Sequence, residues 1–308
     1  MKPRPFIYPS AEELTIVVRA AGERTEEACI AQLLDQIPDP SQLHVLHEQP
    51  FSKAVVRTFE IGVECGRPWL IAIDADLLIF DDSLDRAREI CGKMAPEAFC
   101  ATPLFLCNTV RGLVFRGLHC YRASLLDEAL ELTPSLAADL RPESRYYTAM
   151  KNRGYTREAY AKVLGVHEYE QSYRHIYLKS LLRARKDPDA EVFCEQLQAR
   201  AEHDLDARVA LWGFEDAINH LDAPIEYDWE APLPAFDERM NSAGLAEKAP
   251  LKSSSIEGLA LREVLQHDYH SDRSTEKWVR DMMDFEHGAN KLKEAVTHPP
   301  LFTPFKLN

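Results

Sequence analysis

The sequence has no apolar segment long enough to cross a membrane and no recognisable targeting segment. No apolar run approaches the ~20 residues that a membrane-spanning helix needs. The first residues, MKPRPFIYPS, lack the long apolar stretch of a signal peptide. No CxxC pair occurs, and the cysteines number seven, an odd count, with several among apolar residues. We therefore expect a soluble, cytoplasmic protein with reduced and mostly buried thiols.

The sequence also lacks a positive charge balance. Its 36 Lys and Arg residues are outnumbered by 50 Asp and Glu residues, which gives a formal net charge of -14. Such a chain has no general electrostatic attraction to nucleic acid or to an anionic membrane, so we expect no nucleic-acid partner, although local basic clusters can still bind phosphate. What is present is 45% hydrophobic residues in 308, enough for one large domain or two small ones with a buried core.

Short apolar, β-branched runs alternate with helical patterns in the first 76 residues. LTIVV (14–18), HVLHE (44–48) and WLIAIDAD (69–76) are predicted strands. Between them, apolar residues recur at helical spacing in segments 30–37 and 55–63. This β-α-β-α-β order predicts an α/β fold with a mainly parallel sheet and helices on both faces. Ligands of such sheets bind beyond the C-terminal strand ends.

The rest of the sequence divides into a mixed part and a helical part. Helices are predicted around 84–94, 123–132 and 143–153, and a short strand at 161–169. Beyond about residue 175 the pattern is helical, apart from a segment at about 223–252 that is rich in Pro and acidic residues and is predicted to be irregular. The predicted helical segments of this part are 190–203, 205–221, 256–267 and 273–284. We expect one domain over 1–175 and a helical extension over 176–308.

Asp74 and Asp76, in IAIDADLLIF, end the third predicted strand. Such a pair has three interpretations. It can hold Mg²⁺ or Mn²⁺ that binds a substrate diphosphate. It can be the nucleophile and general acid of a haloacid-dehalogenase-type phosphatase, or it can cap a neighbouring turn. Two βα units precede the pair, whereas in those phosphatases the motif follows the first strand.

The order of elements resembles the GT-A fold of nucleotide-sugar glycosyltransferases, especially the family 2-like group. That pattern is a strand, a nucleotide-contacting loop, a second strand ending in an acid, a helix, and a strand ending in DxD. It matches LTIVVRAAGER, HVLHE, KAVVRTFEIGVECGRPW and LIAIDAD, in that order. Further matches are a glycine-containing loop, RGLVFRGLHCYR, an acid in RPESRYYTAM, and a late histidine in LGVHEY. The resemblance covers roughly residues 14–175.

The resemblance implies a metal-dependent, hexosyltransferase-like enzyme. It would move a sugar from a nucleotide-sugar, most simply a UDP-linked one, to a hydroxyl of an unknown carbohydrate, lipid-linked or protein acceptor. Asp74, Asp76 and His167 would hold Mn²⁺ or Mg²⁺, with Asp76 the better candidate of the two acids. Residues implied to contact the donor are Arg19, Gly22, Glu23, Glu48, Lys53, Arg57, Asp74, Gly112 and Gly117.

The sequence departs from the family pattern at the catalytic base. Ser144 stands where the second acid of the x-E-D motif is expected, and serine is no base without help. Glu143 or Asp139 then remains as the base, unless the alignment is shifted or the mechanism is retaining, so the stereochemistry stays open. A GT-A domain that binds without turnover is a further alternative. The long helical extension also makes a homo-oligomer plausible.

Overall fold

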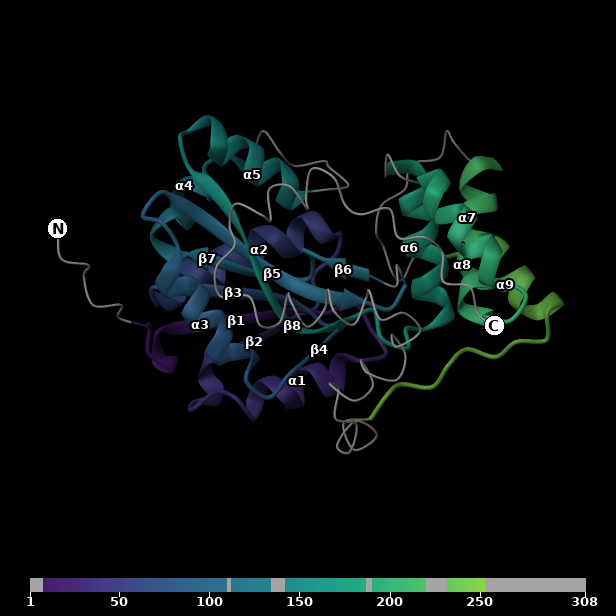
Figure 1. The fold of residues 1–308 in the computed structure, drawn as a ribbon, viewed down its shortest axis with the longest axis horizontal. Helices are drawn as coiled ribbons and strands as arrows, with labels where there is room; N and C mark the ends of the chain where they lie inside the picture. The colour runs from purple at the N-terminus through teal and green to yellow at the C-terminus, as the bar shows by residue number, and fades with distance from the viewer. Residues whose placement is uncertain (1–7, 110–111, 134–141, 187–189, 220–231, 253–308) are drawn as a thin grey trace.

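A computed structural model describes residues 8–109, 112–133, 142–186, 190–219 and 232–252 (Figure 1). Over these residues a central sheet carries helices on both faces, and a group of helices lies at one end of it. The strands are β1 (Leu14–Arg19), β2 (Leu43–Leu46), β3 (Trp69–Asp74), β4 (Leu77–Ile79), β5 (Ala98–Cys107), β6 (Gly112–Val114), β7 (Leu118–Arg122) and β8 (Thr156–His167). The helices are α1 (Glu26–Leu34), α2 (Phe51–Cys65), α3 (Ser83–Lys93), α4 (Leu126–Leu130), α5 (Pro142–Asn152), α6 (Tyr173–Lys186), α7 (Ala190–Arg200), α8 (Leu205–Asn219) and α9 (Pro234–Ser242), with short 3₁₀ turns at Ala11–Glu13, Pro40–Gln42 and Ala123–Leu125.

The sheet is mixed, but its main strands run the same way. The strand order is β2-β1-β3-β7-β5-β8-β4, with β6 paired to β5. Pairing is parallel between β1 and β2, β1 and β3, and β5 and β8. Strand β7 runs antiparallel to both β3 and β5, so β5 and β8 have the same direction as β1 and β3. The C-terminal ends of β1, β3, β5 and β8 therefore meet at one edge of the sheet.

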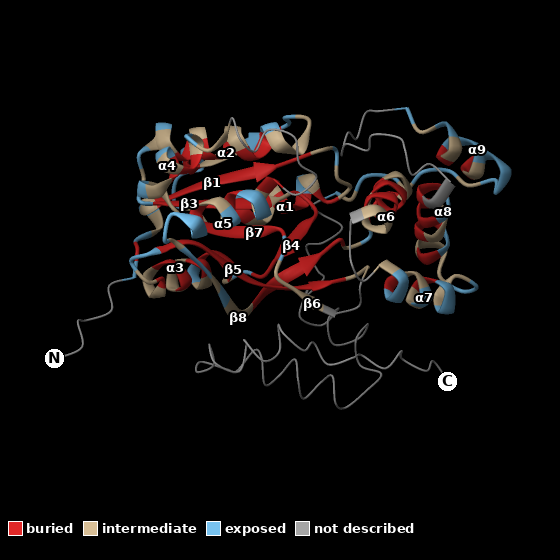
Figure 2. Ribbon diagram, turned by 90° about the horizontal axis from the view of Figure 1, so that it is seen from above, coloured by how far each residue is buried: buried red, intermediate tan, exposed pale blue. Residues whose placement is uncertain are grey.

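Each face of the sheet packs against a separate set of helices. Residues of α1 and α3 form one hydrophobic core with the sheet, and residues of α2, α4 and α5 form another. The second core includes Phe59, whose ring meets those of Phe99, Tyr121 and Tyr146 edge-on, with centroids 5.0–6.1 Å apart. A buried Phe contributes about 1.5–3 kcal/mol, and each such ring pair about 0.5–1.5 kcal/mol more. Figure 2 shows the result, a sheet whose central strands are buried, whereas β2 and the first half of β8 are partly exposed.

The predicted α/β fold class with C-terminal helices is confirmed. Strands β1, β2 and β3 lie where the apolar runs predict them, and α2 ends at Gly66, which takes the left-handed conformation with φ of 64°. Two details differ. A short strand, β4, follows directly after the Asp74–Asp76 turn, and β8 begins at Thr156, earlier than the predicted 161. None of the described helices is long and apolar enough to span a membrane.

The helices after residue 172 build a core of their own. Tyr177, Phe193, Phe214 and Phe236 belong to this core, one from each of α6, α7, α8 and α9. The prediction of an irregular segment at about 223–252 is wrong in part, because α9 lies inside it and buries Phe236 and Met240. Pro234 starts that helix, where a proline is tolerated because its missing N–H would have no partner. The helices predicted at 256–267 and 273–284 lie outside the described residues.

Candidate functional site

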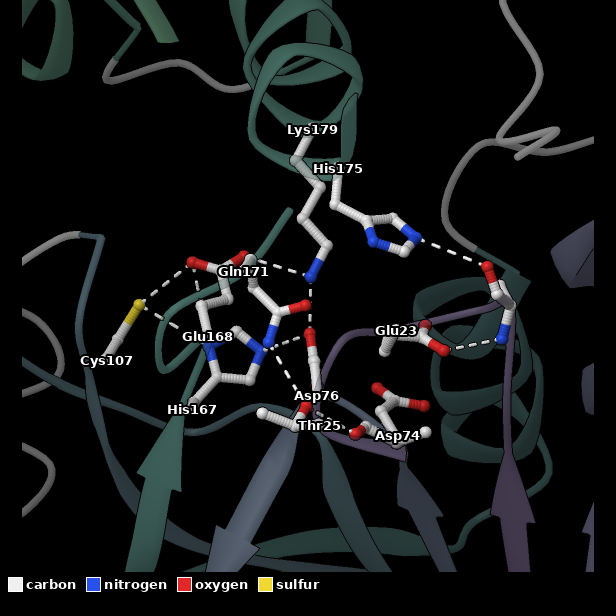
Figure 3. Close-up of polar contacts among 12 residues, drawn as sticks. Glu23, Thr25, Asp74, Asp76, Cys107, His167, Glu168, Gln171, His175 and Lys179 are labelled. Atoms are coloured by element: carbon white, nitrogen blue, oxygen red, sulfur yellow. Dashed lines mark hydrogen bonds and ion pairs between the residues drawn. The ribbon is translucent and has the colours of Figure 1, made fainter. Parts of the chain in front are cut away.

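Four side chains of different chemistry end strands that run in the same direction and finish at the same sheet edge. Arg19 ends β1, Asp74 ends β3, Cys107 ends β5 and His167 ends β8. Arg19 is opposite Asp74 in the β1–β3 register, and Cys107 is opposite His167 in the β5–β8 register. Figure 3 shows α6 lying across this edge, with its side chains directed at the strand ends. This is the position at which open α/β sheets bind ligands.

Asp74 is held by an arginine of the neighbouring strand. Arg19 Nη2 lies 2.7 Å from Asp74 Oδ1, and Arg19 Nη1 lies 2.6 Å from Glu143 Oε1 of α5. Burial, together with Asp76 and Glu143, raises the pKa of Asp74 to about 7, and Arg19 opposes this rise. Arg19 is only 4% exposed, and its guanidinium joins two carboxylates from distant parts of the sequence. Arg19, predicted to contact a nucleotide, thus has two acidic partners already.

Glu143 belongs to a buried polar network. Its Oε2 lies 3.3 Å from His119 Nε2, and its Oε1 also accepts a hydrogen bond of 3.4 Å from the Tyr121 hydroxyl. Burial acts to raise the pKa of Glu143, but Arg19 and His119 hold it far below its ordinary value. A carboxylate held ionised by such partners is a weak base. The geometry thus favours a positioning role for Glu143, and its predicted role as a base remains untested.

Asp76 is more buried than Asp74, and its cationic partner is Lys179 instead of Arg19. Its Oδ2 contacts the ammonium of Lys179, from α6, and lies 3.4 Å from His167 Nε2. Lys179 Nζ is also 3.3 Å from Glu168 Oε1. Burial acts to raise the pKa of Asp76, but Lys179 and His167 hold this pKa below its ordinary value. Asp76 Oδ1 is buried and has no hydrogen-bond partner among the described residues.

The contacts of Asp74 and Asp76 decide whether these residues can bind the predicted Mn²⁺ or Mg²⁺. An open acceptor at Asp76 Oδ1 suits a cation, but the other predicted ligands are occupied. Asp74 pairs with Arg19, and His167 Nε2 faces the Asp76 oxygen that Lys179 also contacts. Two like unit charges 4 Å apart near a protein surface repel by about 4 kcal/mol, and a divalent ion doubles this. As arranged here, Asp74 and Asp76 do not fit a divalent ion, and His167 directs its other ring nitrogen, Nδ1, toward Cys107.

The loop after β1 brings a second carboxylate toward Asp76. Gly22 has a positive φ of 76°, which lets the loop turn back, and Glu23 Oε2 accepts a hydrogen bond of 2.6 Å from the Ala21 amide. Burial and the charge of Asp76 raise the pKa of Glu23 to about 7. The Thr25 hydroxyl donates to the Ala75 carbonyl at 2.8 Å and so ties the loop to the turn between the two aspartates.

The other predicted donor residues are spread more widely. Gly117 lies at the edge, because its carbonyl accepts the Asp74 amide at 2.7 Å, and Gly112 is opposite Cys107 in the β5–β6 pair. Glu48 and Lys53 are exposed near the start of α2. Arg57 pairs with two glutamates of its own helix, at 3.1 and 2.8 Å, which is the geometry of a solvated helix face. Asp139 lies outside the described residues.

Several residues at this edge are not predicted from the sequence. Lys179 and Arg183, one turn apart on α6, line a small pocket with Thr109, Glu168 and Gln171. Lys179 lies in the segment YRHIYLKS, whose tyrosines indicate a helix packed against a core. Nothing in that segment distinguishes its lysine from a lysine on a solvated helix face. Glu168 directly follows the predicted His167, and that adjacency is the one signal in the sequence that could have indicated it.

The sequence matches no protein family and no curated protein. Among solved structures, the chain is similar to a mannose-1-phosphate geranyltransferase from Thermus thermophilus, with 13% identity and a TM-score of 0.31 over 54% of this chain and 78% of that one. It is also similar to a CMP:2-keto-3-deoxy-manno-octonic acid synthetase in complex with CTP, with 12% identity and a TM-score of 0.30 over 48% of this chain and 88% of that one. At these scores neither similarity bears on function.

Proposed function

We propose that the protein is a transferase that moves a sugar from a nucleoside-diphosphate sugar, most simply a UDP-linked one, to a hydroxyl acceptor. The observation that carries the proposal is the strand-end site itself. Asp74, Asp76 and His167, which the sequence resemblance implies as the ligands of a donor-binding metal, lie at one edge of a mainly parallel sheet, where such sheets bind ligands. The pocket at that edge is lined by two cationic side chains, Lys179 and Arg183.

Each group at the edge has a role in this proposal. Lys179 and Arg183 neutralise the diphosphate, both in the ground state and as the leaving group gains charge. Asp76 Oδ1, buried without a partner among the described residues, accepts a hydroxyl of the bound donor. Glu23, with a pKa of about 7, takes the proton of the acceptor hydroxyl. Mn²⁺ or Mg²⁺ at Asp74 and Asp76 is left out, because Arg19 and Lys179 already neutralise these acids.

In this proposal the sheet edge and α6 have different roles in binding the donor. The strand ends bind the donor, and α6 closes the site, since this helix carries Lys179 to the sheet edge. The separate core of α6, α7, α8 and α9 gives that helix a rigid support. We expect the acceptor to approach between the Glu23 loop and α6, which flank Asp76 (Figure 3).

The test is calorimetric titration of the full chain with a panel of nucleotide-sugars, first in EDTA and then with Mn²⁺, followed by transfer and hydrolysis assays. Asp76→Ala is the test variant, and Asp85→Ala, at a position whose aspartate side chain is 72% exposed, is the matched control. We expect one donor class to bind, Asp76→Ala to weaken that binding about ten-fold or more, and Asp85→Ala to leave it unchanged. No binding by any nucleotide-sugar would refute the proposal.

Two rival functions have their own signatures in the same assays. Phosphatase turnover that is lost in Asp74→Asn would replace the transferase with a haloacid-dehalogenase-type enzyme. Donor binding without any transfer or hydrolysis would favour a domain that binds without turnover. The contacts of Glu143 favour this second rival, because the predicted base is engaged by Arg19, His119 and Tyr121.

A further inference from the structure

We propose that Cys107, His167 and Glu168 form a binding site for a divalent metal ion of the Zn²⁺ class at the C-terminal ends of β5 and β8. The sulfur, one imidazole nitrogen and one carboxylate oxygen of these residues all lie within 4.8 Å of one another, and all three residues are buried. This site shares His167 with the predicted set of Asp74, Asp76 and His167, but its other two ligands, Cys107 and Glu168, are new. It does not depend on the proposed sugar transfer.

The separations of the three atoms match a tetrahedral metal site. Cys107 Sγ lies 3.2 Å from Glu168 Oε2 and 3.4 Å from His167 Nδ1, and Nδ1 lies 3.9 Å from Oε2. Zinc binds sulfur at about 2.3 Å and nitrogen or oxygen at about 2.0–2.2 Å, which places tetrahedral ligands about 3.3–3.6 Å apart. The observed triangle lies within about half an ångström of those edges, so little movement is needed to admit an ion.

The proton count of the cluster also favours an ion. His167 Nε2 faces Asp76 Oδ2 at 3.4 Å, so a proton on Nε2 leaves Nδ1 as a lone pair directed at Cys107. Cys107 has one thiol proton, which cannot serve Nδ1 and Glu168 Oε2 together. A metal ion would contact all three atoms at once, with release of the thiol proton to solvent.

The surroundings hold the three ligands in this arrangement. Asp76 lies behind His167, the carboxylate–histidine–metal order that fixes a ligand's ring orientation. Lys179 is 3.3 Å from Glu168 Oε1 and leaves Oε2 facing the thiol. Glu168 itself has a φ of 58°, a conformation that non-glycine residues adopt rarely and that tends to persist at functional sites. Its amide donates to the Asp76 carbonyl at 3.0 Å, which keeps it there.

The ligand set selects the class of metal. A thiolate and an imidazole suit Zn²⁺, Co²⁺ and similar ions, whereas Mg²⁺ and Ca²⁺ require oxygen ligands. Three protein ligands leave one position of a tetrahedron for water or substrate, as in catalytic zinc sites. Glu168 and Thr109 line the small pocket at this edge, so the open position adjoins a space with room for about one water molecule.

The test uses untagged full-length protein, because a polyhistidine tag binds the same metals. Metal content is measured by mass spectrometry after dialysis against Zn²⁺, and Co²⁺ is titrated in parallel to record a thiolate-to-cobalt absorption band. Cys107→Ser is the test variant, and Cys100→Ser removes another buried thiol of β5 as the matched control. We expect about one ion per chain in the wild type and the control, and at least a ten-fold weaker uptake in Cys107→Ser and in Glu168→Gln.

Any of three results would overturn the proposal. The wild-type protein could take up no Zn²⁺, or its Co²⁺ complex could lack a thiolate band. Cys107→Ser and Cys100→Ser could also take up equal amounts of metal. The absorption band is read on the wild type alone, so it decides the matter even if Cys107→Ser fails to fold. A Mn²⁺ site that depends on Asp76 and excludes Zn²⁺ would likewise contradict the proposal.

Discussion

Arg19 Nη2 lies 2.7 Å from Asp74 Oδ1, and the two residues are direct neighbours across the parallel β1–β3 pair. The same guanidinium is 2.6 Å from Glu143, so one cation from the first strand holds two acids from elsewhere in the chain. Because Asp74 is fixed in this way, Asp76 is the aspartate left to face Lys179 of α6. This pairing explains how two acids in one DxD motif come to occupy different environments.

Replacing Arg19 with glutamine should destabilise the fold strongly. Asp74 and Glu143 would lose their shared cation in a site where Arg19 is 4% exposed, and removing one partner of a buried ion pair costs about 3–5 kcal/mol. Arg57→Gln is the matched control, because that side chain is 38% exposed and pairs with glutamates of its own helix. Arg57→Gln should lower the free energy of unfolding by less than about 1 kcal/mol. Urea unfolding measures the free energy of unfolding of both variants, and an equal loss in the two would refute the prediction.

The buried His175 should make stability depend on pH. Its ring contacts Ser172 Oγ at 3.0 Å and the Ala21 carbonyl at 3.3 Å, and burial, followed by the charge of Lys179, lowers its pKa to about 3. Between about pH 6.5 and pH 3 the unfolded chain binds a proton that the folded chain does not, so stability falls as the pH falls. The loss should reach about 2 kcal/mol at pH 5 relative to pH 8. Measured by urea unfolding, the free energy of unfolding of His175→Gln should fall by about 2 kcal/mol less than that of the wild type between pH 8 and pH 5. The same pH dependence in both proteins would refute the prediction.

Gly213→Ala should weaken both the helical extension and the site. A methyl group at Gly213 would lie 2.3 Å from the Tyr177 carbonyl oxygen and 3.0 Å from the Leu181 amide, so α8 would push the α6 backbone away. Such overpacking costs about 1–3 kcal/mol. Since α6 carries Lys179, anion binding should weaken as well. Gly62→Ala meets only leucine side-chain atoms, at 2.5 and 3.0 Å, and serves as the milder control in thermal unfolding.

Alkylation of the folded protein should separate the cysteines into two groups. Cys65 and Cys194 are partly exposed, whereas Cys29, Cys91, Cys100, Cys107 and Cys120 are buried, and none of these seven described cysteines forms a disulfide. Burial raises the pKa of Cys100 to about 12, which removes its reactive thiolate at pH 8. Iodoacetamide followed by peptide mass spectrometry should label Cys65 and Cys194 first. Labelling of Cys107 at the same rate would show that the strand-end site is open to solvent.

The sheet can be predicted from the sequence because its signals are local. Buried parallel strands give continuous apolar runs, and LTIVV and WLIAI are such runs. Strand β4 gives no separate signal, because it follows Asp74 after a turn of two residues and its LLI merges with the preceding run. Helix α9 escapes prediction because the composition of its segment, rich in proline and acids, obscures the helical periodicity.

The site can be predicted only where strand ends reveal it. Asp76 and His167 end their apolar runs, and they lie 3.4 Å apart. Lys179 reaches Asp76 across 103 positions, and the placement of α6 depends on packing against α8 that no local pattern encodes. The pairing of Arg19 with Asp74 does have a signal in the sequence, because the last residues of adjacent parallel strands are neighbours.

If the Asp76 edge binds a nucleoside-diphosphate sugar through Lys179, replacing this lysine must weaken donor binding. Calorimetric titration in EDTA compares Lys179→Met with Lys162→Met. Lys162 is the matched lysine, with 23% of its side chain exposed against 24% for Lys179, and it pairs with Glu89 instead. We expect Lys179→Met to bind the donor about ten-fold or more weakly and Lys162→Met to bind it as the wild type does. Equal affinities of the two folded variants would refute donor binding through Lys179.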